Sequence, residues 1–263
     1  MSDIVVSASW LADRLDADGV RVVDARNAWE YDGIGHIPGA VNVPFDRFRS
    51  EAAGEAGMLP GADRFAELMS EAGVGADDRL VAYDDTHGVF AARLLVTAEL
   101  YGHDPDRLHL LDGDFSSWKL EHPTGEEPPD PPRVEYEAAF QRDGPLVERE
   151  VVEAAMDDHD TVLVDTREAW EFEEGHIPGS VRLDWRDLVD DETRGLRPDP
   201  DLRGLLADAG IIPDKRILLY CNTARRISHT YTVLRHLEYP DLAFYEGSLT
   251  EWEAEGGDLE TGV

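Results

Sequence analysis

Cysteine occurs once in this 263-residue chain, at Cys221, directly after the apolar run RILLY and before the short segment NTAR. The thiolate is the nucleophilic form of cysteine, and the start of a helix stabilises it through unpaired backbone N–H groups and the positive end of the helix dipole. Two arginines close by add fixed positive charge. We therefore predict a reactive Cys221 in an anion-binding loop of Asn222, Thr223, Ala224, Arg225 and Arg226.

Two less reactive interpretations compete with this one. A lone intracellular cysteine is most often an inert core residue, and two arginines at a helix start can be solvated and paired with surplus carboxylates. The coincidence of strand end, helix start and cations favours the reactive thiol. A single cysteine also excludes an intramolecular disulfide and a multi-cysteine metal cage. We expect neither a metal nor a cofactor.

Apolar runs predict the elements that hold this loop. TVLVD (161–165), RILLY (216–220) and LAFY (242–245) suit strands buried on both faces, whereas the stretches 201–210 and 225–237 carry apolar residues at helical spacing. Strands that alternate with helices indicate an α/β domain whose mainly parallel sheet has helices on both faces. Ligands bind at the carboxyl ends of such strands, where Cys221 stands.

The chain also contains a long internal repeat. DARNAWEYDGIGHIPGA, which begins at Asp24, returns as DTREAWEFEEGHIPGS, which begins at Asp165, and the first copy carries its own apolar runs VRVVD, LVAY and LHLL. Five prolines between positions 121 and 137 disfavour a helix there. The sequence therefore predicts an N-terminal domain over 1–120, a proline-rich acidic linker over 121–145 and a similar C-terminal domain over 146–263.

Residues shared by both copies are expected to be structural. Asp84 occupies the position in the first copy that matches Cys221, so only the second copy can use a thiol. His36 and His176 occur in both copies, and we therefore assign them to turns and hydrogen bonds. The repeated Asp-x-Arg is interpreted as a local salt bridge, and Trp118 and Trp252 as core aromatics.

Acidic residues dominate the composition. Fifty-seven Asp and Glu against 24 Lys and Arg give a formal charge of -33, which repels phosphate backbones and anionic lipid surfaces. Nucleic acid and membranes are therefore poor partners. The acidic balance is typical of a halophilic protein in a cytoplasm with molar salt, where charges are screened over about 3 Å. The N-terminus shows no secretory signal, and a cytoplasmic location is expected.

The repeated D-x-R-x-x-x-E-[YF]-x-x-G-H-I-P-G-[AS] pattern, the Tyr-Cys strand end and the run YEGSLTEW (245–252) resemble two-domain rhodaneses, the thiosulfate sulfurtransferases. The resemblance implies two rhodanese-like domains, of which the C-terminal one is catalytic and the N-terminal one, with Asp84, is inactive. It implies that Cys221 takes the sulfane sulfur of thiosulfate as a persulfide, releases sulfite, and passes the sulfur to cyanide or a thiol. The substrates are then a small-molecule sulfur donor and acceptor, with a protein sulfur acceptor as a further partner.

Three alternatives remain open beside this function. Phosphatases of a related fold place five residues between Cys and Arg, whereas here Arg226 follows Cys221 after four. 3-Mercaptopyruvate sulfurtransferases usually carry a glycine-containing loop after the cysteine and commonly an arginine at the position of Glu171, and both departures favour thiosulfate. A persulfide carrier for a biosynthetic partner would use the same chemistry, and the sequence does not distinguish it.

Overall fold

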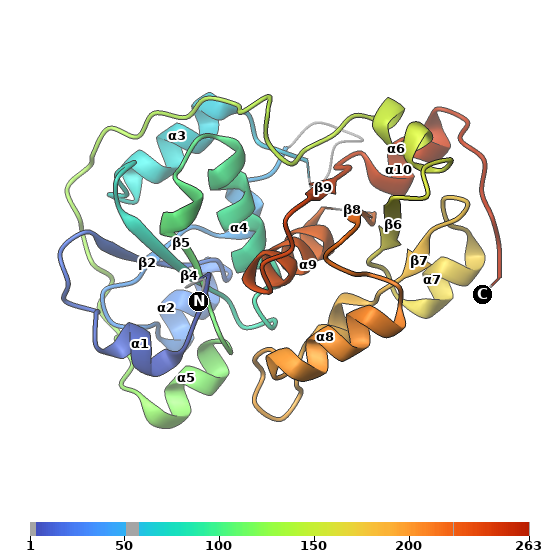
Figure 1. Cartoon of the computed structure of the whole chain (residues 1–263). Coiled ribbons are helices and arrows are strands. Elements are labelled where there is room, and N and C mark those ends of the chain that lie inside the picture. The colour runs from blue at the N-terminus through green and yellow to red at the C-terminus, as the bar shows by residue number, and fades with distance from the viewer. Residues whose placement is uncertain (1–3, 51–57, 223, 263) are drawn as a thin grey trace. The chain divides into compact units, whose positions relative to one another are not determined.

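The computed structural model describes residues 4–50, 58–222 and 224–262, and the chain divides into two compact units. The first unit extends to Arg142 and also contains Asp191–Leu196, while the second contains Asp143–Asp190 and the residues from Arg197 onward. Each unit is built on a parallel sheet with helices on both faces (Figure 1). The predicted α/β fold class is confirmed.

The sheet of the first unit has five parallel strands in the order β1-β5-β4-β2-β3. These strands are β1 (Val5–Val6), β2 (Val20–Asp24), β3 (Val41–Asn42), β4 (Arg79–Tyr83) and β5 (Leu108–Leu111). The helices are α1 (Ala8–Ala12), α2 (Ala28–Ile34), α3 (Ala62–Glu71), α4 (Val89–Leu100) and α5 (Phe115–Glu121), with 3-10 turns at Phe45–Arg47 and Pro105–Arg107.

Both faces of this sheet are buried, which explains its continuous apolar runs. Successive residues of a strand point to opposite faces. Val23 and Leu80 accordingly belong to the core formed with α3 and α4, whereas Val22 and Val81 belong to the core formed with α1 and α5. Figure 1 shows the two helix pairs on opposite sides of the strands.

The sheet of the second unit has four parallel strands in the order β7-β6-β8-β9. They are β6 (Thr161–Asp165), β7 (Val181–Arg182), β8 (Arg216–Tyr220) and β9 (Leu242–Phe244). The helices are α6 (Arg149–Ala155), α7 (Ala169–Glu174), α8 (Asp199–Asp208), α9 (Arg225–His236) and α10 (Ser248–Ala254), with a 3-10 turn at Trp185–Leu188. Val152 of α6 and Trp252 of α10 pack on one face with Leu218, and on the other Tyr231 of α9 packs edge-on against Phe244, at 5.3 Å between ring centroids.

A short segment of the chain, Asp191–Leu196, packs with the first unit although it lies far along the sequence. Its anchor is Arg194, whose guanidinium Nε donates to both oxygens of Asp114, at 2.8 and 2.7 Å. The same guanidinium donates to the carbonyl of Asp85, at 3.2 Å. These contacts hold the segment 191–196 against the loop that follows β4.

Candidate functional site

Cys221 lies where strand β8 ends, and its side chain is fully buried. Its backbone is held on both sides by the start of α10. The N–H group donates to Oγ of Ser248 at 3.2 Å, and the carbonyl accepts from the N–H of Leu249 at 3.0 Å. The thiol therefore sits on a rigid carboxyl-terminal edge of the sheet, where ligands of open α/β sheets bind.

The predicted loop joins β8 to α9. Ala224 caps the helix in the left-handed region, with φ 57° and ψ -19°, and Arg225 opens the first turn. Backbone N–H groups in that turn have no partner within the helix and carry the positive end of its dipole. The structure places Asn222, Ala224, Arg225 and Arg226 around this turn, while Thr223 lies outside the described residues.

Arg226 is tied to a carboxylate of helix α7. Its guanidinium makes a two-pronged ion pair with Glu171, in which Nη1 approaches Oε2 closely and Nη2 lies 3.1 Å from Oε1. Oε1 of Glu171 also accepts from the side-chain amide of Asn222, at 2.9 Å. Two of the predicted binding residues are thus held by one carboxylate, and the charge of Arg226 is compensated.

Burial and pairing act together on these charges. Burial raises the pKa of Glu171, but the hydrogen bonds from Arg226 and from the N–H of Glu168 outweigh it and hold that pKa below its usual range. Burial lowers the pKa of Arg226, yet the bonds to Glu171 and the nearby sulfur of Cys221 raise it overall. Both groups are therefore ionised at neutral pH.

Glu171 is the site residue that the sequence analysis missed as a loop partner. The neighbouring sequence indicates only a capping role for Glu171, because the side chain of the third residue of a helix commonly accepts a hydrogen bond from the N–H of the N-cap residue. That bond is present, from Glu168 N–H to Glu171 Oε2 at 3.1 Å. Nothing local indicates the contact with Arg226, which lies 55 residues further along the chain.

A cavity of about 450 Å³ opens beside this loop. Asn222 and Glu171 form the wall next to the loop, and Leu249 connects it to the start of α10. The remaining lining residues are Arg167, Trp170, Glu174, Gly175, Thr250, Glu253 and Leu259.

The loop of the first unit that matches the Cys221 loop binds a carboxylate through backbone N–H groups. Asp84 follows β4 and is completely buried. Its carboxylate accepts four backbone N–H groups, at 2.6 to 3.0 Å, from Thr86, Gly88, Phe90 and Ala91. Burial raises the pKa of Asp84, and the four N–H groups oppose that rise. The end of β4, the loop after it and the start of α4 thus surround an anion with N–H donors, and we call this arrangement an anion cradle. In this copy the anion is the carboxylate of Asp84.

At one matching position the loops of the two units have the same backbone conformation. His87 stands three residues after Asp84 with φ 54°, and Ala224 stands three residues after Cys221 with φ 57°. Left-handed conformations are uncommon for residues other than glycine. The next position differs, because Gly88 has φ 83° and precedes α4, whereas Arg225 already belongs to α9. The shared left-handed residue favours a similar turn of the chain after Cys221 and after Asp84.

The residues shared by both copies make structural contacts, as predicted. Asp24 pairs with Arg26 and Asp165 with Arg167, at 2.5 and 2.6 Å, and all four are buried. Trp118 and Trp252 are 1% and 2% exposed. The rings of His36 and His176 stack on Tyr31 and Phe172, and their nitrogens contact backbone carbonyls.

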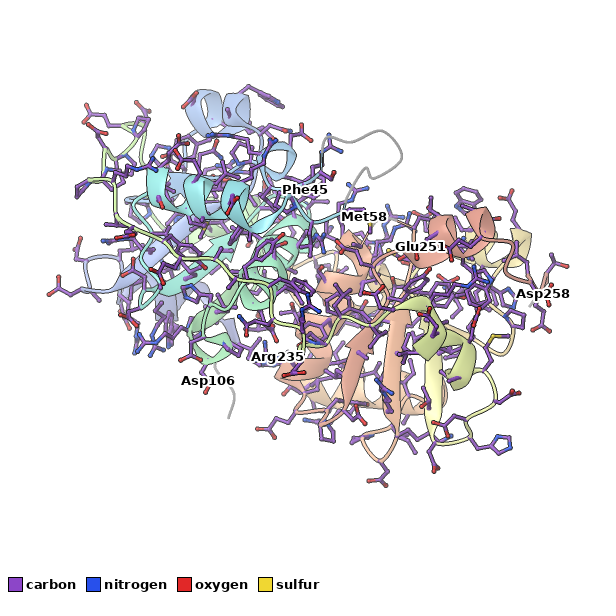
Figure 2. The ribbon with its side chains drawn as sticks, turned by 90° about the horizontal axis from the view of Figure 1, so that it is seen from above. Phe45, Met58, Asp106, Arg235, Glu251 and Asp258 are labelled. Carbon is purple, nitrogen blue, oxygen red and sulfur yellow. The ribbon has the colours of Figure 1, made fainter. Side chains whose placement is uncertain are left out.

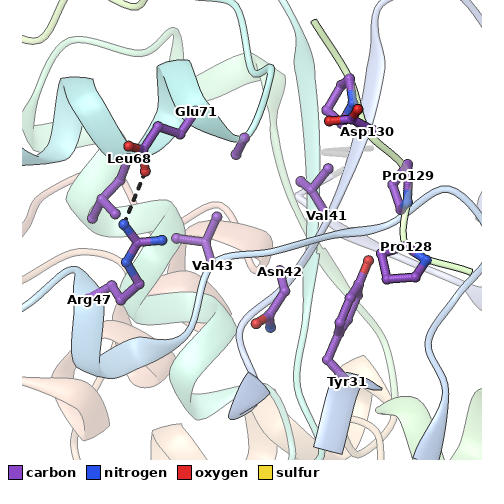
Figure 3. Close-up of a pocket in the computed structure, with 12 residues that line it drawn as sticks. Tyr31, Val41, Asn42, Val43, Arg47, Leu68, Glu71, Pro128, Pro129 and Asp130 are labelled. Carbon is purple, nitrogen blue, oxygen red and sulfur yellow. Dashed lines mark hydrogen bonds and ion pairs between the residues drawn. The ribbon is translucent and has the colours of Figure 1, made fainter. Parts of the chain in front are cut away.

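A separate cavity of about 220 Å³ lies in the first unit (Figure 3). The ion pair of Arg47 and Glu71, at 3.0 Å, lines one part of it, and the prolines of the chain segment 128–131 line another. Its wall also contains Asp130, Asn42 and Tyr31, and none of the lining residues is a cysteine.

The described residues contain neither a cluster suited to a metal ion nor a helix suited to a membrane. Within 4–50, 58–222 and 224–262, no three His, Cys, Asp or Glu side chains are grouped so that they could hold a metal ion. Across the same part of the chain, no helix is both long enough and apolar enough to cross a membrane.

Comparison with known proteins adds the following relationships. A family model described as the rhodanese-like domain matches residues 7–121 and again residues 148–255. A thiosulfate sulfurtransferase of Azotobacter vinelandii is 31% identical over 258 residues, which span 95% of this chain and 93% of that protein. One of Corynebacterium glutamicum is 32% identical over 276 residues, with 94% and 87% covered.

Solved structures share the fold. The 3-mercaptopyruvate sulfotransferase SseA from Escherichia coli matches with a TM-score of 0.83 and 28% identity, over 93% of this chain and 98% of that one. The anaerobic ergothioneine biosynthesis enzyme from Chlorobium limicola matches with a TM-score of 0.86 and 21% identity, over 99% of this chain and 71% of that one.

Proposed function

Because the chain belongs to the rhodanese-like family and is a sulfurtransferase, we propose that it takes the sulfane sulfur of thiosulfate on Cys221 and passes it to cyanide or a thiol. The observation that carries this proposal is the anion cradle around Asp84, whose position in the first copy matches that of Cys221 in the second. A persulfide is an anion attached to the end of the side chain, which is the kind of group that such a cradle stabilises.

The first half-reaction transfers one sulfur atom. The thiolate of Cys221 attacks the outer sulfur of thiosulfate, a sulfur–sulfur bond forms, and the original sulfur–sulfur bond breaks so that its electron pair leaves with sulfite. In the second half-reaction, cyanide attacks the outer sulfur of the persulfide, thiocyanate leaves and the thiolate returns. With Cys221 as the only cysteine, no second thiol of the chain can convert the persulfide into a disulfide.

The residues of the loop take distinct parts in this scheme. Asn222, Thr223 and Ala224 form the curved backbone, and Arg225 and Arg226 supply guanidinium groups for the sulfonate oxygens of thiosulfate. We assign the first domain to a non-catalytic role, because the carboxylate of Asp84 cannot carry a sulfane sulfur. Within the proposed boundaries, the catalytic domain is 146–263.

Intact mass after incubation with thiosulfate tests the proposal. We expect an increase of about 32 Da, equal to one sulfur, that cyanide removes. The Cys221→Ser variant should show neither the increase nor turnover. Turnover that survives in this variant would exclude Cys221 as the sulfur carrier.

3-Mercaptopyruvate is the second candidate donor, because the SseA structure superimposes over nearly the whole chain. Parallel assays with the two donors decide between them, and we expect thiosulfate to be preferred. A protein acceptor would make the chain a persulfide carrier, which pull-down from a high-salt lysate tests. The acidic composition supports a halophilic, cytoplasmic setting for this reaction.

A further inference from the structure

We propose that Glu171 is a specificity-determining residue, whose fixed negative charge sets how strongly the Cys221 loop binds anionic sulfur compounds according to their charge. The inference rests on the proposed function, since it concerns the loop that would bind thiosulfate. It goes further by separating two effects of this residue. Glu171 lacks the guanidinium that would bind the carboxylate of 3-mercaptopyruvate, and its negative charge also opposes the charge of thiosulfate.

Glu171 contacts two residues of the Cys221 loop. Its carboxylate is only 7% exposed and accepts hydrogen bonds from Arg226, Asn222 and the N–H of Glu168. Arg226 and Asn222 both belong to the loop, while Glu171 itself stands on α7. Salt screens a buried pair of charges much less than an exposed pair, so this arrangement persists in molar salt.

The first domain provides an internal comparison. Glu30 occupies the position of Glu171 in the repeat, on helix α2. It makes the capping bond with the N–H of Asn27, at 3.2 Å, and a second bond with the side chain of that same residue, at 3.1 Å. Capping alone therefore accounts for the glutamate of the first copy, but the two-pronged ion pair to the loop is described only for Glu171.

The charge of Glu171 opposes both thiosulfate and sulfite. Thiosulfate is a dianion at neutral pH and sulfite is a mixture of the mono- and dianion, so a loop with an uncompensated Arg226 would hold the product as well as the donor. Tighter binding of thiosulfate in this way would lower KM, and slower release of sulfite would keep kcat from rising. A carboxylate that offsets Arg226 weakens both complexes and lets sulfite leave.

The experiment compares Glu171→Gln with Glu30→Gln. Dissociation constants are measured by calorimetry in a Cys221→Ser background, with thiosulfate as the dianion and 3-mercaptopyruvate as the monoanion. Because Coulomb energy is proportional to ligand charge, E171Q should tighten thiosulfate binding on the order of tenfold and 3-mercaptopyruvate binding only about threefold. E30Q should leave both constants unchanged.

Kinetics of E171Q with Cys221 intact give an independent readout. We expect a lower KM for thiosulfate, stronger inhibition by sulfite and no gain in kcat. Glu171→Asp keeps the charge and should keep the wild-type ratio of the two dissociation constants. A residue with a merely structural role would weaken binding of both ligands in E171Q and in E171D.

Each result either supports or overturns the inference. Equal effects of E171Q on the two ligands, or weaker binding of both, would overturn it. Thermal unfolding verifies that the variants are folded, and Glu171→Ala removes the same charge if E171Q does not fold. Failure of the proposed function has a different signature, namely a wild-type protein that gains no sulfur from thiosulfate.

Discussion

Asp84 and Cys221 stand at matching positions of the two copies, each directly after a strand. Asp84 satisfies four N–H groups that would otherwise be buried without an acceptor. In Asp84→Asn, the amide NH₂ would face some of these donors. We expect the free energy of unfolding to fall by about 2–4 kcal/mol, since unsatisfied buried groups are costly. Urea unfolding in molar salt measures this loss.

A surface change of the same kind serves as the control for Asp84→Asn. Asp106 is exposed in the same unit (Figure 2), and Asp106→Asn should change the free energy of unfolding by no more than about 0.5 kcal/mol. Sulfur loading at Cys221 should persist in both folded variants. Equal stability of the two would mean that the four N–H groups do not depend on the carboxylate charge.

Arg226 is expected to affect both binding and stability. Arg226→Ala should weaken transition-state binding of thiosulfate by roughly 1.5–3 kcal/mol, and by more than Arg225→Ala, because a charge-assisted contact is lost. Steady-state kinetics of the two variants test this ranking. Unchanged kinetics in both would mean that backbone amides alone bind the donor.

The same Arg226→Ala variant should have a pH-dependent stability defect. Without Arg226, burial dominates and raises the pKa of Glu171, so the variant carries an uncompensated buried carboxylate at neutral pH. We expect a loss of about 2–4 kcal/mol at pH 7. This loss shrinks as the pH falls toward 5, since Glu171 takes up a proton in the variant, whereas the wild type keeps the benefit of its lowered pKa until the pH falls below the usual value of 4.5. Urea unfolding at pH 7 and pH 5 measures it, and a pH-independent loss would contradict it.

At the scale of elements, the strands were predictable because they are buried on both faces. VRVVD, TVLVD and RILLY coincide with β2, β6 and β8 residue for residue. The two-residue strands β1, β3 and β7 were not predicted, since a run so short has no periodicity of its own and forms only against its neighbour. Helix α8 begins at Asp199, two residues before the expected start, because its first turn is polar and carries no apolar signal.

Contacts across long sequence separations were not predictable. The thiol, its loop and the helix start follow from adjacent residues, and so the sequence indicates them. The pairing of Glu171 with Arg226 and the packing of Asp191–Leu196 on the first unit depend on how elements come together. The sequence accordingly predicts a thiol in an anion-binding loop, but not the carboxylate that compensates Arg226.

Helix α9 starts with a strained residue whose relief can be measured. Ala224 adopts a left-handed conformation that costs an L-residue roughly 1–2 kcal/mol. Glycine has no such penalty, and Ala224→Gly should raise the free energy of unfolding by up to about 1 kcal/mol. The same substitution at Ala207, exposed within α8, should lower it by about 0.5–1 kcal/mol. Chemical denaturation of both variants tests the opposite signs, and a loss at both positions would contradict the strain argument.

At the scale of the whole molecule, the charge imbalance is larger than ion pairing can offset. Acidic side chains outnumber Lys and Arg by 57 to 24, and Asp258 is an example that is exposed (Figure 2). Pairs on the surface, such as Arg133 with Glu67, are more than half exposed on both sides, and such pairs contribute little. Most surface carboxylates therefore repel one another.

We predict that dilution of salt unfolds the protein. The Debye length grows from about 3 Å to about 30 Å between 1 M and 0.01 M ionic strength, so repulsion extends over the whole particle. Folding free energies are typically about 5–15 kcal/mol, and modest repulsion per charge is enough to exceed them. Circular dichroism and sulfur transfer across a potassium chloride series should decline together, because the Cys221 loop needs β8 and α9 in place.

Sucrose separates charge screening from the general stabilising effect of excluded solutes. It is excluded from protein surfaces and favours the compact state, but it does not screen charge. In dilute buffer with sucrose we expect recovery of fold and activity to be incomplete, whereas potassium chloride restores both. If circular dichroism and activity stay constant down to tens of millimolar salt, self-repulsion is not what limits this fold. The acidic surface would then require another explanation, such as a basic protein partner that covers it.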